Sequence, residues 1–77
     1  MSLGYVLISA TPGSETTVFA TLQTVPEAVE LVPLFGEYDM LAKVEAPDME
    51  TLGKVILDKI RTVPGIVMTK TLAVAKL

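Results

Sequence analysis

The side chains that could do chemistry in this chain form two small groups far apart in the sequence. The first is Gly36–Asp39, in which Tyr38 offers a ring face and a hydroxyl, and Asp39 could accept from a ligand ammonium. The second is Thr69 and Thr71, whose hydroxyls project from one face of an extended segment and could bind a carboxylate or an amide. Each group also has a plainer explanation, because Gly and Asp are common in turns and threonine favours strands.

The chain lacks the residue types that catalytic sites use most often. The 77 residues include no His and no Cys, which removes the commonest general base and metal ligand, the thiolate nucleophile and any thiolate metal site. Ser9 and Ser14 therefore have no partner for a Ser-His-Asp triad. The five glycines form neither a P-loop nor a dinucleotide-binding fingerprint. We expect no catalytic residue, no metal and no cofactor.

The distribution of charge argues against direct binding to nucleic acid, and the short apolar runs argue against a membrane-spanning helix. The net charge is −3, and residues 1–42 carry five acidic side chains and neither Lys nor Arg. A protein that binds DNA by itself normally presents a basic face. No apolar run approaches the ~20 residues of a membrane-spanning helix, and no basic leader precedes the N-terminal apolar stretch. We expect a cytoplasmic protein that contacts neither DNA nor lipid directly.

Hydrophobic periodicity predicts the elements that must position the two groups. It indicates strands at 3–10, 28–35, 40–46 and 66–77, and helices at 15–25 and 49–63. The tripeptides Thr24-Val25-Pro26 and Thr62-Val63-Pro64 lie 38 residues apart, with matching apolar positions around them, which indicates two similar βαβ halves. Two such halves build a ferredoxin-like α+β sandwich with both helices on one sheet face. Pro33 then belongs in an edge strand, because it cannot donate to a ladder.

The predicted sheet has a second face with nothing in the chain to cover it. The first strand is apolar on both faces, with Leu3, Tyr5 and Leu7 on one and Val6, Ile8 and Ala10 on the other. The last strand has Leu72 and Val74 on one face and Ala73, Ala75 and Leu77 on the other. Strands that are apolar on both faces need cover on both, and exposed patches of that size are uncommon in monomers. We therefore expect a homodimer formed through the sheet face.

Taken together, these features resemble the effector-binding domain of the Lrp/AsnC family, called RAM for regulation of amino-acid metabolism. The resemblance rests on Gly36-Glu37-Tyr38-Asp39 followed by Met40–Val44, on Ile60–Ile66 with its Val-Pro-Gly, and on Thr69-Lys70-Thr71. It implies a dimeric α+β barrel type of assembly, further association of dimers, and transcription regulation. It also implies an amino-acid effector bound where two dimers meet, by Gly36, Tyr38, Asp39, Thr69 and Thr71.

The chain departs from that family in one large respect, because it begins almost directly at the first predicted strand. We therefore expect residues 1–77 to form a single RAM-like domain without a helix-turn-helix, and a helix-turn-helix-containing Lrp-like regulator is an expected partner. Two other functions stay open. The chain could be a purely structural subunit of mixed Lrp-like assemblies, which needs no ligand. It could also be a small enzyme of the dimeric α+β barrel type, which needs a deep pocket with an acid–base residue.

Overall fold

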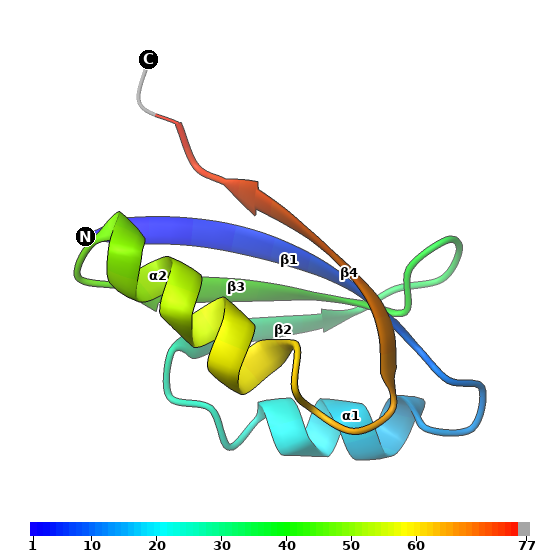
Figure 1. The fold of residues 1–77 in the computed structure, drawn as a ribbon. Coiled ribbons are helices and arrows are strands. Elements are labelled where there is room, and N and C mark those ends of the chain that lie inside the picture. The colour runs from blue at the N-terminus through cyan, green and yellow to red at the C-terminus, as the bar shows by residue number, and fades with distance from the viewer. Residues whose placement is uncertain (76–77) are drawn as a thin grey trace.

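The chain folds in the order β-α-β-β-α-β. A computed structural model describes residues 1–75. Its elements are β1 (Ser2–Ala10), α1 (Glu15–Leu22), β2 (Ala28–Pro33), β3 (Met40–Ala46), α2 (Met49–Val55), a π-helical turn η1 (Ile56–Ile60) and β4 (Ile66–Ala73) (Figure 1). This order confirms the predicted ferredoxin-like α+β fold. Within the described residues, no helix is long and apolar enough to cross a membrane.

The four strands form one antiparallel sheet in the order β2-β3-β1-β4. The strands β1 and β3 are central, and β2 and β4 are the edges. Pro33 lies in the edge strand β2 opposite Met40, where its missing N–H faces no neighbouring strand. In the central strand β1, Ile8 pairs with Met40 of β3 on one side and with Thr69 of β4 on the other.

One sheet face packs against both helices and makes the core. Alternate residues of β1 and β3 point to this face. The buried side chains are Val6, Ile8, Ala10, Met40, Ala42, Val44 and Ala46 from the sheet, Val18, Leu22, Leu52, Val55, Ile56 and Ile60 from the helical segments, and Val63 from the turn that follows them. Each fully buried Val or Leu side chain contributes about 1.5–3 kcal/mol. Burial of these apolar side chains, which alternate along the strands and line one side of each helix, therefore keeps both helices on one side of the sheet.

The second helix begins with a side-chain cap and is shorter than the helix predicted over residues 49–63. The Oδ1 atom of Asp48 accepts from the Thr51 N–H at 2.7 Å, and this bond lowers the pKa of Asp48. The expected continuous helix changes at Ile56 to a π-helical turn, closed by the Arg61 N–H donating to the Ile56 carbonyl at 2.9 Å. Met49, the first residue of this helix, is exposed.

Three predicted ends are too long. The helix α1 stops at Leu22 rather than residue 25, and β2 stops at Pro33 rather than residue 35. There the chain leaves the ladder, and the Leu34 N–H donates across the connection to the Asp39 carbonyl at 2.9 Å. The strand β4 ends at Ala73, and Leu77, predicted at the end of this strand, lies outside the described residues.

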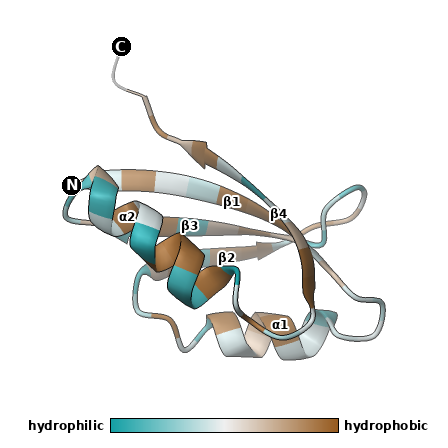
Figure 2. Cartoon of the chain, viewed as in Figure 1, coloured by the Kyte–Doolittle hydropathy of each residue, from teal (hydrophilic) through white to brown (hydrophobic). Residues whose placement is uncertain are grey.

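The other sheet face carries an apolar ridge with no layer over it in this chain. Leu3, Tyr5 and Leu7 lie along it on β1 and are half-buried, while Leu72 of β4, opposite Tyr5, is exposed. Hydrophobic residues alternate with less apolar ones along β1 and fill the first part of β4 (Figure 2). Lys43 and Glu45 interrupt this face on β3, so the ridge follows the middle of the sheet.

Candidate functional site

The connection between β2 and β3, residues 34–39, is tied to the end of β1. The Asp39 N–H donates to the Ile8 carbonyl at 2.8 Å, and the Ala10 N–H donates to Asp39 Oδ2 at 2.7 Å. The Ser9 hydroxyl donates to the Glu37 carbonyl at 3.2 Å. These three bonds anchor the carboxyl-terminal side of the connection, including the predicted ligand residue Asp39.

The carboxylate of Asp39 is half-buried and only partly used by the fold. Oδ2 accepts from Ala10, whereas Oδ1 has no hydrogen-bond donor within residues 1–75. No Lys or Arg occurs before Lys43 to neutralise the charge from the same half of the sequence. The side chain is therefore held in place while one oxygen stays available to a cationic or hydrogen-bonding ligand.

The other residues of the connection differ in their roles: one adopts a turn conformation, one is half-buried and one is exposed. Gly36 has φ +125°, a conformation that favours glycine, and a Cβ there would meet no atom within 4 Å. Tyr38 is half-buried beside Asp39. Phe35, which the sequence analysis did not single out, is fully exposed at the start of the turn. This large apolar side chain therefore lies on the surface and is not part of the core.

Thr69 and Thr71 lie on the opposite side of β1 from Asp39. Thr69 pairs with Ile8 along one edge of β1, and Asp39 bonds to Ile8 along the other edge. Two strand spacings therefore separate Thr69 from Asp39, about 10 Å in all. Thr71 is two residue pairs further along, opposite Val6, and is exposed. The two hydroxyls share a face, as predicted, but one copy of the chain does not bring them into contact with Asp39.

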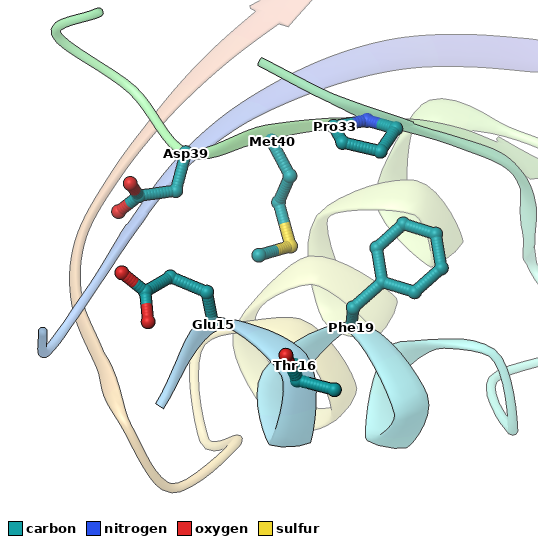
Figure 3. A pocket seen from close by; sticks show the side chains of 6 residues that line it. All are labelled: Glu15, Thr16, Phe19, Pro33, Asp39 and Met40. Atoms are coloured by element: carbon teal, nitrogen blue, oxygen red, sulfur yellow. The ribbon is translucent and has the colours of Figure 1, made fainter. Parts of the chain in front are cut away.

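A pocket of about 240 Å³ opens beside Asp39, between α1 and the ends of β2 and β3. Its lining residues are Glu15, Thr16, Phe19, Pro33, Asp39 and Met40. Figure 3 shows the Met40 side chain between the two carboxylates on one side and the rings of Phe19 and Pro33 on the other. Of these six residues, only Asp39 was predicted from the sequence to belong to a site. The only feature of the sequence that could have pointed to another pocket residue was Glu15 in the first turn of the predicted helix. An acidic residue there is normally explained by its favourable interaction with the helix dipole.

Comparisons with solved structures show the same fold in other proteins. The crystal structure of FFRP-DM1 matches with a TM-score of 0.92 and 35% identity, over 97% of this chain and 100% of that one. Escherichia coli AsnC matches with a TM-score of 0.90 and 25% identity, over 99% of this chain and 52% of that one. A Neisseria meningitidis regulator solved as an L-Met complex matches with a TM-score of 0.84 and 22% identity, over 97% and 50%.

The curated relatives are longer proteins. The HTH-type transcriptional regulator FL11 of Pyrococcus horikoshii is 34% identical over 74 residues, which are 96% of this chain and 48% of that regulator. The chain thus spans about half the length of that relative. Homocitrate synthase of Sulfurisphaera tokodaii is 39% identical over 61 residues, which are 79% of this chain and 13% of that enzyme.

The matching family model includes both the residues of the candidate site and the whole fold. The model of the Lrp/AsnC ligand-binding domain matches residues 3–76, nearly the whole chain. Domains of this family are regulatory rather than catalytic, are associated with transcription regulation, bind effectors and typically oligomerise. The anchored Gly-x-Tyr-Asp connection, the βαββαβ sheet and this match agree, and the chain belongs to the Lrp/AsnC ligand-binding domain family.

Proposed function

We propose that this domain binds an amino acid or a related small metabolite without converting it, with Asp39 as the acceptor for the ligand ammonium. The observation that carries the proposal is the half-used carboxylate of Asp39, fixed by Ala10 and facing a pocket. A fixed carboxylate can make a charge-assisted hydrogen bond, which is roughly twice as strong as a neutral one. The Neisseria meningitidis regulator of the same fold, solved with L-Met, supports an amino acid as the ligand class.

The remaining site residues act across a contact between copies. Thr69 and Thr71 are separated from Asp39 by β1, so the hydroxyls that complete a site around Asp39 come from a second copy. There they donate to the ligand carboxylate, which no basic side chain of residues 1–42 can serve. Gly36 gives the main chain close access to the ligand, and Tyr38 flanks it. Ligand binding then favours the assembled state, because the site is complete only there.

Assembly of the domain proceeds in two steps. A homodimer forms through the open sheet face, where the ridge of Leu3, Tyr5 and Leu7 has no cover in one chain. Dimers then associate further, and the fully exposed Phe35, on the connection that carries Asp39, lies at this second contact. Aromatic side chains are enriched where proteins meet, which supports the placement of Phe35.

The assembled domain acts in transcription regulation inside the cell through a DNA-binding partner. FL11 and similar relatives are HTH-type regulators about twice as long as this chain. The net charge of −3 provides no basic face for direct DNA binding. The partner we propose is therefore a Lrp-like protein with a helix-turn-helix, joined through the same domain-to-domain contacts.

A thermal-shift screen with the twenty amino acids tests the ligand. Binding at 100 times the dissociation constant stabilises the native state by about 2.7 kcal/mol, and about 1 kcal/mol moves the melting temperature of so small a domain by about 4–8 °C. At least one amino acid should raise the melting temperature, and Asp39→Asn should abolish the rise. Glu37→Gln, on the same connection but exposed, is the matched control and should keep it. A flat screen, or an unchanged response of Asp39→Asn, contradicts the proposed contact and favours a purely structural subunit.

The match to homocitrate synthase supports a second function for the same module. In that enzyme the matching segment makes up 13% of the chain, so the domain also occurs joined to a biosynthetic enzyme. We propose as the alternative that this domain regulates a metabolic enzyme in response to its ligand. Pull-down from the native host with and without the amino acid found in the screen separates the two: a helix-turn-helix protein supports the first and a metabolic enzyme the second.

A further inference from the structure

The pocket beside Asp39 has an acidic half and an apolar half. The carboxylates of Asp39 and Glu15 lie on one side of it, and the rings of Phe19 and Pro33 lie on the other (Figure 3). The side chain of Met40, which is almost wholly buried, lies between the two halves and lines the pocket. A ligand that satisfies both halves must itself carry a positive charge next to an apolar part.

Both carboxylates are held by the main chain at one oxygen. The Gly13 N–H donates to Glu15 Oε1 at 2.8 Å, and the Ala10 N–H donates to Asp39 Oδ2 at 2.7 Å. Neither carboxylate forms an ion pair within the described part of the chain, whereas Glu27 is paired with Lys59. Two fixed negative charges with no protein cation beside them are complementary to a cation from outside.

The pocket is open to solvent, so its volume sets how much of that cation the pocket can enclose. At about 30 Å³ for each water in the liquid, 240 Å³ holds about eight waters, which corresponds to a ligand part of roughly six to eight non-hydrogen atoms. A primary ammonium on four or five carbons fits that size. The carbons would lie against Phe19, Pro33 and Met40, where leaving water is favourable.

We propose that this pocket binds a primary ammonium carried on a short apolar chain, with Glu15 sharing the ammonium with Asp39 and Phe19 and Met40 setting the size of the chain. The inference rests on the proposed function in its ammonium contact at Asp39, and adds Glu15, Phe19 and Met40 as residues that determine specificity. For an amino-acid effector it selects an apolar side chain. It does not depend on Thr69 or Thr71.

The methyl groups of methionine report the binding directly. The chain has four methionines, of which Met40 lines the pocket, while Met49 and Met68 are exposed elsewhere. Isoamylamine is the probe, and isoamyl alcohol is the control with the same carbon chain and no charge. In protein labelled with ¹³C at the methionine methyls, the amine should shift Met40 saturably and leave Met49 and Met68 in place. The alcohol should bind roughly tenfold more weakly, as expected for one lost charge-assisted hydrogen bond.

Two variants test the residues. Glu15→Gln keeps an oxygen for the Gly13 N–H but removes the charge, and should weaken amine binding roughly tenfold while leaving alcohol binding unchanged. Glu50→Gln, an acidic residue in the first turn of the other helix, α2, is the matched control and should change neither. Phe19→Ala should move the preference toward longer amines.

The outcomes separate this inference from the proposed function. An amino acid that raises the melting temperature without shifting Met40 overturns the pocket and leaves the contact at Asp39 intact. An amine that shifts Met40 while the amino-acid screen is flat supports the pocket and removes the amino-acid effector. No shift at Met40, equal shifts at all methionines, or equal affinity for amine and alcohol overturns the inference whatever the screen shows.

Discussion

Asp39 accepts a hydrogen bond from the main-chain N–H of Ala10 at 2.7 Å, although 29 positions separate the two residues in the sequence. The bond joins the β2–β3 connection to the last residue of β1, next to the bulge between Ser9 and Ala10. An aspartate at this place therefore closes the end of the central strand and carries the charge that we assign to ligand binding. Its two roles can be separated experimentally, because the first needs an oxygen and the second needs a charge.

The first prediction concerns stability at that bond. Asp39→Ala removes the acceptor of a part-buried N–H and should lower the free energy of unfolding by about 1–3 kcal/mol. Asp39→Asn keeps an oxygen in place and should lose clearly less. Urea denaturation of both variants, with Glu37→Ala as the exposed control, measures the difference. Equal stability of Asp39→Ala and the parent protein would show that Asp39 is not needed to close β1.

The second prediction separates the two faces of β1. Leu7 lies on the open face and is half-buried, whereas Val6 beside it is fully buried in the core. Leu7→Glu should leave the fold intact but break self-association, because a charge would enter the sheet-to-sheet contact. Val6→Glu should prevent folding. Analytical ultracentrifugation and circular dichroism read the two properties, and a dimer that survives Leu7→Glu contradicts dimerisation through this face.

The third prediction compares two glycines with positive φ. Gly65, at the turn into β4, has φ +99°, and a Cβ there would lie 2.9 Å from Val18 Cγ2, a buried atom of α1. Gly36 has φ +125°, but a Cβ would meet no atom within 4 Å. Gly36→Ala should cost about 1–3 kcal/mol of backbone strain, and Gly65→Ala should cost more because the clash adds to the strain. Chemical denaturation should therefore rank the parent above Gly36→Ala and both above Gly65→Ala.

The fourth prediction is a pH dependence that comes from Glu27. A side-chain hydrogen bond from Lys59, with the two charged groups 3.0 Å apart, holds the pKa of Glu27 below its ordinary value of 4.5. A carboxyl with a lowered folded pKa stabilises the fold above its unfolded pKa, and this stability is lost as the pH falls through the folded value. The melting temperature of the parent should therefore fall between about pH 5 and about pH 3 more steeply than that of Glu27→Gln.

Lys59→Gln is the reciprocal variant for this pair. It removes the cation that lowers the pKa of Glu27, so it should flatten the same part of the pH profile. Part of the slope should persist in both variants, because the Thr51 N–H lowers the pKa of Asp48 in the same direction. If Glu27→Gln retained the full slope of the parent protein, the ion pair would contribute nothing measurable, as is common for exposed pairs.

Local patterns in the sequence determined the elements and the face that each one buries. The alternation of Met40, Ala42 and Val44 predicted β3 with its observed bounds, and Pro33 predicted an edge strand, because pleat and proline chemistry act within a few residues. The ends were less well determined. Where β2 and β4 stop depends on which partner strand still offers hydrogen bonds, and α2 gives way to a π-helical turn that the periodicity of its apolar residues does not predict.

The candidate site was only half visible in the sequence. Gly36, Tyr38 and Asp39 are adjacent along the chain, so their type and order were enough to single them out. Glu15 and Phe19 reach the pocket from a helix more than a dozen residues earlier, and sheet order puts β1 between Asp39 and Thr69. Hydrophobic periodicity predicts on which face of its helix or strand a side chain lies, but it does not predict which other element packs against that face. Packing and strand register, which depend on contacts between distant parts of the chain, decided that Asp39 faces Glu15 rather than Thr69.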